Sequence, residues 1–286
     1  MEERNERGET LEEFLARYDE TQYRRPSNTV DMILLTVLKG KLKVLLVKRK
    51  DHPFIHDWAM PGGFVNFDED LDAAMKRELE EETNLFDSTY FRQLYTFGNA
   101  DRDPRTRVIT TVYLSMTPSE NIKMTSAGDD AMDTGWFTIQ KITMTTDGHE
   151  RKSILMLDEE EKGIHLRYEI YDTACDNYVQ TRSKLIESSN AKLAADHIKA
   201  INMAIDVVRN RAASTGIMFN LLPKECTLRE IQEVYEAIVN HPVDTGNFRR
   251  DIKKMLVATG NTTIVNGRKV ATYSFNPLLP FVKETL

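Results

Sequence analysis

The chain has 286 residues, of which 41% are hydrophobic and 29% charged, and its formal net charge is −7. This ordinary globular composition is sufficient for two domains, and the acidic balance excludes a chain that binds nucleic acid over its whole surface. The N-terminus lacks an apolar signal segment, and no apolar run is long enough to span a membrane. Cys175 and Cys226 are far apart and lack metal-ligand spacing, which is typical of a reducing compartment. We therefore expect a cytoplasmic protein with no membrane partner.

The charge is distributed unevenly along the chain. From residue 223 to residue 286, nine Lys or Arg residues stand against seven Asp or Glu residues, so this segment carries +2 and the remainder −9. The difference predicts two parts that have different partners.

Residues 1–140 predict a mixed α/β unit. A capping box at Thr10 and Glu13 begins a short amphipathic helix. Residues 29–50 contain two β-rich runs around a Lys-Gly-Lys turn, which predicts a hairpin. Further strands are expected at residues 91–98, 108–116 and 135–139, with a polar loop between the first two.

The middle of the chain is harder to interpret. Residues 153–157 and 163–171 could form a hairpin around an acidic turn, so we describe residues 141–190 as an insertion or an additional hairpin of unknown role. A helix is expected from Asn190 to Arg211, because apolar residues recur there at helical spacing. Residues 190–222 would therefore connect the first unit to the C-terminal part.

One predicted helix concentrates carboxylates on a single face. Glu78, Glu81 and Glu82 are spaced i, i+3 and i+4, so their side chains lie together. A solvated acidic face would explain them, but hard divalent cations also take oxygen ligands of this kind. Arg77 is four residues before Glu81 and could orient it. The preceding Gly62-Gly63 pair permits a tight turn and close approach of a ligand.

These residues carry a family resemblance. Gly63, Glu69 and the run from Arg77 to Leu85 resemble the Nudix box, except that Asn84 replaces a glycine of that pattern. Asn is the best substitute for Gly at a helix C-terminus. The resemblance implies a Nudix αβα sandwich with a mixed sheet, and hydrolysis of a nucleoside diphosphate linked to another group. It further implies that Glu78, Glu81 and Glu82 hold Mg²⁺ or Mn²⁺ with support from Glu69, and that Arg77 belongs to the catalytic set.

Three other segments resemble a narrower Nudix group. Residues 23–31, 52–64 and 95–116 are similar to ADP-ribose pyrophosphatases and to Nudix-related transcriptional regulators. Arginines could bind the diphosphate or the ribose, because guanidinium groups match phosphate oxygens; exposed surface arginines are the alternative. The expected substrate-binding residues are Arg49, Gly62, Gly63, Arg102, Arg105 and Arg107. Phe54 and Trp58 could stack on a base, although core packing is the better interpretation of Trp58.

Residues 223–286 predict a winged helix-turn-helix. A capping box at Thr227 and Glu230 begins one amphipathic helix, and a second one follows the turn at residues 240–246. Phe248, Ile252, Met255 and Leu256 form the expected inner face of the second helix. Asn266-Gly267 then indicates a hairpin. The expected DNA-binding residues are Arg249, Arg250, Lys253, Lys254 and Arg268, although a dimerisation or lid domain with a solvated basic face would have the same pattern.

Two functions follow from this combination. The first is a metal-dependent hydrolase that cleaves the diphosphate of ADP-ribose or a related nucleotide. The alternative is a transcriptional regulator that binds a DNA operator and uses the Nudix domain as a nucleotide sensor. The general base would be a glutamate of the box, Asp129 or Asp130, and the resemblance implies a homodimer. Retention of Glu78, Glu81 and Glu82 favours the hydrolase.

Overall fold

The computed structural model describes residues 3–83, 90–122, 131–276 and 278. Its helices are α1 (Leu11–Arg17), α2 (Leu71–Thr83), α3 (His197–Ala212), α4 (Leu228–Val239) and α5 (Thr245–Ile252), with short 3₁₀ helices η1 (Glu20–Gln22), η2 (Ser119–Asn121), η3 (Gly216–Leu221) and η4 (Lys253–Met255). Its strands are β1 (Ser27–Leu38), β2 (Lys41–Arg49), β3 (Trp58–Ala59), β4 (Gly62–Phe64), β5 (Tyr90–Phe97), β6 (Val108–Met116), β7 (Ala131–Thr146), β8 (Glu150–Glu159), β9 (Ile164–Cys175), β10 (Tyr178–Leu185), β11 (Leu256–Val265) and β12 (Arg268–Phe275).

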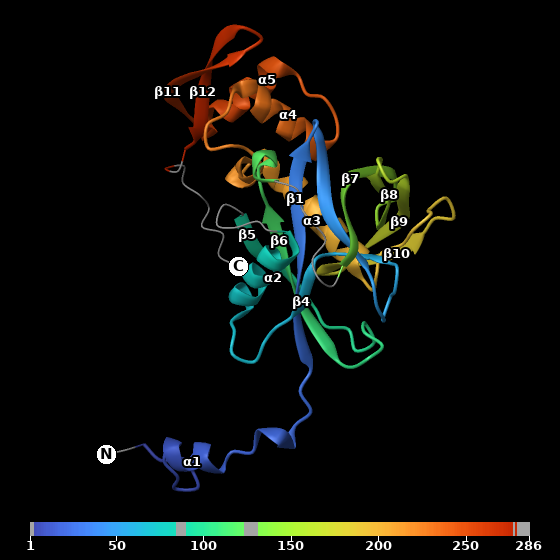
Figure 1. The fold of residues 1–286 in the computed structure, drawn as a ribbon, viewed down its shortest axis with the longest axis vertical. Coiled ribbons are helices and arrows are strands. Elements are labelled where there is room, and N and C mark those ends of the chain that lie inside the picture. The colour runs from blue at the N-terminus through green and yellow to red at the C-terminus, as the bar shows by residue number, and fades with distance from the viewer. Residues whose placement is uncertain (1–2, 84–89, 123–130, 277, 279–286) are drawn as a thin grey trace.

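A large mixed sheet forms the centre of the molecule (Figure 1). Its strand order is β10-β9-β8-β7-β2-β1-β6-β5, with β3 paired to β2 and β4 paired to β1. Strands β1 and β6 are parallel, and the other pairs are antiparallel. The predicted hairpin at residues 29–50 is confirmed, because β1 and β2 join through Lys39 and Gly40.

The sheet is covered by a helix on each face, which confirms the α/β sandwich. Alternating residues of β1 point to opposite faces. Met32 and Leu34 pack with Met75 of α2, whereas Ile33 belongs to the second core cluster, which includes the apolar stripe of α3. The sheet therefore places α2 and α3 on opposite sides of β1.

The sheet continues beyond residue 140. Strand β7 has 16 residues, so the short strand expected at residues 135–139 was wrong in length. The expected hairpin at residues 153–171 is confirmed as β8 and β9, and β10 adds a further antiparallel strand. Leu155 and Leu166 are fully buried in the core that includes α3. Residues 141–185 are thus an extension of the central sheet, and the expected boundary at residue 140 falls inside β7.

Helix α3 begins seven residues later than the apolar pattern suggested, at His197 instead of Asn190. Residues 192–194 are not helical because they bond to β3 around an isolated bridge between Leu193 and Trp58. The Trp58 N–H donates to the Lys192 carbonyl at 3.0 Å, and the Ala194 N–H donates to the Trp58 carbonyl at 2.8 Å. Leu193 therefore contributes to the core from a bridge beside β3.

The C-terminal part is a winged helix. Helix α4 begins with the expected capping box at Thr227 and Glu230. Phe248, Ile252 and Met255 are buried, as expected, but Leu256 begins β11 and does not belong to the helix. Strands β11 and β12 form the long hairpin at the top of Figure 1.

Helix α1 confirms the first capping box but makes no core. Both reciprocal bonds between Thr10 and Glu13 are present. The helix lies at the end of an N-terminal arm, away from the sheet (Figure 1), and none of its residues is buried. Within the described part of the chain, no helix is long and apolar enough to cross a membrane.

Candidate functional site

A cavity of about 560 Å³ opens between α2, the sheet and the start of α3. Its polar wall combines predicted carboxylates and predicted arginines. From the expected site residues it contains Arg49, Gly62, Gly63, Arg77, Glu78, Glu81, Glu82, Arg102 and Arg105. Residues far apart in the sequence are therefore brought together, because the start of β1, the end of β2 and β4 all lie beside the acidic face of α2.

Arg77 links several of the carboxylates. Its guanidinium makes two bonds to Glu69, from Nη2 at 2.7 Å and from Nε at 3.1 Å. Its Nη1 donates to Glu78 at 2.7 Å and to Glu81 at 3.2 Å. The expected contact with Glu81 is present, but Glu69 is the closer partner. These bonds hold the pKa of the Glu69 carboxyl at about 2, so this group stays ionised at neutral pH.

Glu78 is the most buried of the three box carboxylates. Its side chain is 10% exposed, whereas that of Glu81 is 57% exposed. Burial raises the pKa of Glu78, although the hydrogen bond from Arg77 acts in the opposite direction. The Glu78 carboxylate lies directly against Gly63, where an added Cβ would clash with Oε1. Gly63 therefore allows the loop to pack closely on this carboxylate, and a side chain at this position would have to displace the end of Glu78.

We expect Gly63→Ala to destabilise the fold by about 1–3 kcal/mol, since overpacking of this size forces the neighbouring side chain to move. The free energy of unfolding in urea measures the effect. Gly98→Ala is the matched control, because its Cβ would meet nothing closer than Ile109 at 3.9 Å. Equal stability of the two variants would contradict the packing argument.

The donor set fits a hard divalent cation in its chemistry. Glu78, Glu81 and Glu82 offer carboxylate oxygens, which Mg²⁺ and Mn²⁺ prefer. Among the described residues, no three His, Cys, Asp or Glu side chains are already grouped as metal ligands. Arg77 instead supplies the positive charge beside Glu78 and Glu81. The carboxylates thus suit the metal, and binding it would require Arg77 to give up some of these contacts.

The four predicted arginines do not share one environment. The Arg49 Nε donates to the Pro53 carbonyl at 2.8 Å, and Arg105 pairs with Asp103 at 2.9 Å. Arg102 is almost fully buried and pairs with Asp196 at 2.9 Å. Arg107 is exposed and does not line the cavity. The structure therefore brings three of the four arginines to the cavity wall.

Sequence reasoning missed residues that enter from β1 and α3. Asp31 accepts a bond from the Thr110 hydroxyl at 2.6 Å and lines the cavity. His197 is buried, and its Nδ1 accepts from the Met60 N–H at 2.9 Å. Burial lowers the pKa of His197, so the ring is neutral and can serve as this acceptor. No local motif marks Asp31 or His197, because their positions depend on the pairing of distant strands.

Trp58 and Phe54, the two aromatic residues considered for base stacking, lie in different environments. Trp58 is 1% exposed and packs edge-on against Phe137, with ring centroids 4.8 Å apart, so the core interpretation is confirmed. Phe54 lines the cavity and is only partly buried. Asn84, Asp129 and Asp130 lie outside the described residues.

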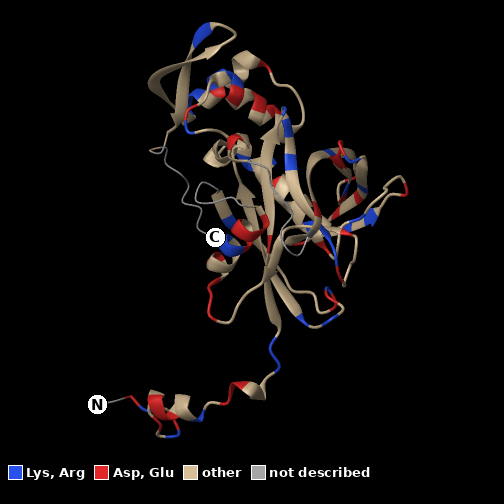
Figure 2. Cartoon of the chain, viewed as in Figure 1, with Lys and Arg blue, Asp and Glu red and all other residues tan. Residues whose placement is uncertain are grey.

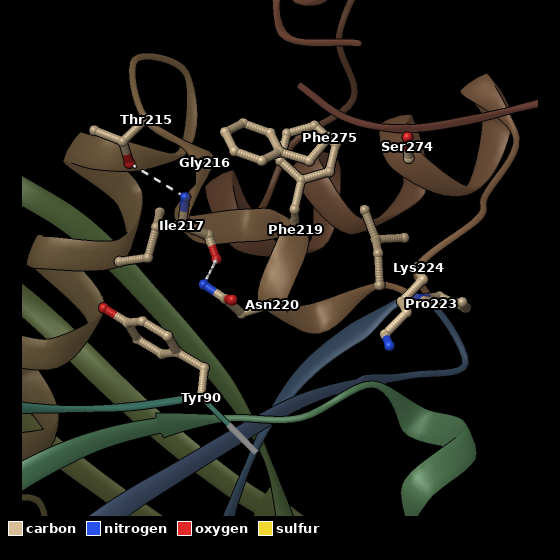
Figure 3. Close-up of a pocket in the computed structure, with 11 residues that line it drawn as sticks. Tyr90, Thr215, Gly216, Ile217, Phe219, Asn220, Pro223, Lys224, Ser274 and Phe275 are labelled. Carbon is tan, nitrogen blue, oxygen red and sulfur yellow. Dashed lines mark hydrogen bonds between the residues drawn. The ribbon is translucent and has the colours of Figure 1, made fainter. Parts of the chain in front are cut away.

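A second cavity of about 610 Å³ lies between Tyr90, η3 and the end of β12 (Figure 3). Its walls are largely apolar, and the rings of Phe219 and Phe275 are 4.9 Å apart. Lys224 is the sole charged group among its described lining residues. The chemistry of charged substrates is therefore assigned to the first cavity.

The winged helix exposes a basic surface. Arg249 and Arg250 lie on α5, Lys253 and Lys254 on η4, and Arg268 at the tip of the β11–β12 hairpin, and all five are exposed. Figure 2 shows Lys and Arg residues along α5 and at this hairpin, while α4 is more acidic. Such a surface can neutralise phosphates.

Both the N-terminal unit and the C-terminal winged helix match known protein families. Residues 26–157 match the NUDIX domain, and residues 218–275 match the NrtR DNA-binding winged helix domain. The chain is 28% identical over 266 residues to the ADPR responsive transcriptional repressor NtrR of Acinetobacter baylyi, covering 92% of this chain and 87% of that protein. It is 35% identical over 129 residues to an ADP-ribose pyrophosphatase of Methanocaldococcus jannaschii, covering 45% of this chain and 72% of that enzyme. It also resembles the crystal structure of Shewanella oneidensis NrtR complexed with a 27mer DNA, with a TM-score of 0.61, 26% identity, and coverage of 87% and 93%.

Proposed function

Because the chain belongs to the Nudix family and carries an NrtR-type winged helix domain, we propose that it is a DNA-binding regulator whose Nudix domain binds ADP-ribose. The observation that carries this proposal is the joining of the two sites by α3. This helix begins at the wall of the charged cavity, and its last turn contacts α4 of the winged helix. The similarity to the NtrR repressor over 92% of the chain supports the same combination.

The cavity has the chemistry that a nucleoside diphosphate compound requires. Arg49, Arg102 and Arg105 provide guanidinium groups for phosphate oxygens. Phe54 provides an apolar surface at the same wall. The winged helix provides the phosphate contacts for DNA through Arg249, Arg250, Lys253, Lys254 and Arg268. We expect the protein to act as a homodimer, because two copies would present two DNA-reading helices to a symmetric site.

Hydrolysis of ADP-ribose is the second proposed activity, and the retained carboxylates favour it. Glu78, Glu81 and Glu82 would hold Mg²⁺ or Mn²⁺, and Glu69 would keep Arg77 in place. A bound metal activates water and neutralises the charge that develops on the phosphate. The 35% identity to an ADP-ribose pyrophosphatase supports this activity.

Three binding measurements test the regulator. Duplexes selected by the protein from a random-sequence pool should share a motif, and ADP-ribose should bind in a calorimeter with EDTA present. Addition of ADP-ribose should weaken binding of the selected duplex. Absence of any sequence preference at modest salt would overturn the regulator.

Incubation with Mg²⁺ and a panel of nucleoside diphosphate compounds tests the hydrolase. We expect ADP-ribose to yield AMP and ribose 5-phosphate. If none of the compounds gives a metal-dependent product, the proposed hydrolase activity is refuted and the proposed regulator is unaffected.

A further inference from the structure

Asp196 occupies the N-cap of α3 but does not cap the helix. Aspartate at this position commonly accepts a hydrogen bond from the second or third helical N–H. Here φ is −102° and ψ is 17°, and no side-chain cap bond forms. The carboxylate instead accepts from Arg102, at 2.9 Å from Nη2 and 3.4 Å from Nε. The Asp196 carboxylate is therefore held by Arg102 in this structure and gives no cap to the first turn of α3.

Arg102 lies where a diphosphate would compete for it. Its side chain is 6% exposed and lines the charged cavity. A second carboxylate, Asp31, is 3.9 Å from Nη2. Guanidinium groups bind phosphate oxygens as readily as carboxylates. A bound diphosphate would thus draw Arg102 away from Asp196.

The opposite end of α3 reaches the winged helix. Arg209, in the last turns of α3, donates from Nε to the Ile238 carbonyl of α4 at 2.9 Å. It also donates from Nη1 to the Lys141 carbonyl of β7 at 3.1 Å. The helix has 16 residues, which corresponds to about 24 Å at 1.5 Å per residue. A change at Asp196 can therefore reach α4 through one regular helix.

We propose that Asp196 is the positioning residue through which the nucleotide cavity controls the winged helix. The inference rests on the proposed regulator. In the free protein Asp196 binds Arg102. When a nucleoside diphosphate takes Arg102, Asp196 caps the first turn of α3, which its negative charge favours at a helix N-terminus. The start of α3 shifts with its new cap, and Arg209 transmits the shift to α4. Two discrete partners for one carboxylate provide the two states that coupling requires.

Asp196→Asn tests the proposal, because asparagine caps helices as well as aspartate but has no charge to hold Arg102. The variant should resemble the nucleotide-bound protein. Its affinity for the selected duplex without ADP-ribose should already equal that of the ADP-ribose-saturated wild type. Added ADP-ribose, with EDTA present, should change this affinity by less than about 2-fold, against a coupling of about 5–150-fold in the wild type. ADP-ribose itself should bind the variant at least as tightly, since no carboxylate competes for Arg102.

Hydrogen exchange gives a reading that does not depend on DNA. The Ile198 amide should exchange more slowly when ADP-ribose binds the wild type, and should be slow in Asp196→Asn without ligand. Glu169→Gln is the matched control, because it breaks an ion pair with Lys152 at 2.6 Å on a distant part of the sheet. Its coupling should equal that of the wild type.

Three outcomes would overturn the proposal. An Asp196→Asn variant that responds to ADP-ribose as the wild type does would refute the switch and leave the regulator intact. Loss of coupling in Glu169→Gln as well would show that coupling does not depend on Asp196 in particular. If the wild type binds DNA equally well with and without saturating ADP-ribose, both the proposed regulator and the proposed switch are refuted.

Discussion

Glu82→Gln is expected to slow metal-dependent hydrolysis of ADP-ribose by about 100-fold or more. Glu82 lines the charged cavity on the same face of α2 as Glu78 and Glu81. In the proposed hydrolase, replacing its carboxylate by an amide would remove a negative ligand from the cation, and metal ions supply several kcal/mol of transition-state stabilisation. The shape of the side chain is kept, so the fold should persist. The measurement is the rate of AMP release at saturating Mg²⁺, with circular dichroism to verify folding.

Glu80→Gln is the control for charge. Glu80 belongs to the same helix but is exposed and does not line the cavity. It should hydrolyse ADP-ribose at nearly the wild-type rate. If both variants lose activity equally, the effect comes from the total charge of α2. If Glu82→Gln retains full turnover, Glu82 is not a ligand of the catalytic metal.

Local signals in the sequence were sufficient for many of the elements. Capping boxes at Thr10 and Thr227 correctly marked the starts of α1 and α4. The turn residues Gly40 and Asn266-Gly267 correctly marked two hairpins. In each case the information lies within a few residues, because capping and turn geometry are local properties.

Elements that depend on pairing between distant segments could not be predicted from the sequence. The apolar pattern before α3 predicts helix, but Leu193 is buried beside Trp58, with which it forms a β-bridge. Strand β7 carries exposed residues from 142 to 146, so its second half lacks the alternation that marks a half-buried strand. Its pairing with β8 keeps it extended. Neither feature can be obtained from a short window of sequence.

The residues of the candidate site fall into the same two groups, those that a local pattern predicts and those that only tertiary contacts bring together. Glu78 and Arg77 were found because helical spacing places carboxylates and a guanidinium on one face. Asp31 and Asp196 were not predicted as site residues. Asp196 pairs with Arg102, and Asp31 lies 3.9 Å from it. They lie on β1 and at the start of α3, and only the folded sheet brings these elements to one wall. Spacing identifies the members of one helix, whereas the partners of Arg102 require the tertiary structure.

The double variant Arg249→Ala, Arg250→Ala is expected to weaken binding of the selected duplex and to reduce its salt dependence. Both residues are exposed on α5. If each neutralises one phosphate, the slope of log affinity against log salt should fall by about 1.8, because each phosphate contact contributes about 0.9. Binding titrations at several salt concentrations give this slope. Hydrolysis should not change, since both residues lie in the winged helix and the charged cavity does not.

Arg229→Ala separates the role of α5 from that of general basic charge. Arg229 lies on α4, is 71% exposed and pairs with Glu233 at 2.7 Å. Its removal lowers the positive charge of the same domain by one but leaves the basic residues of α5 unchanged. The salt slope should therefore stay at the wild-type value in Arg229→Ala. A decrease in slope half as large as that of the double variant would mean that long-range charge, and not contact through α5, governs DNA binding.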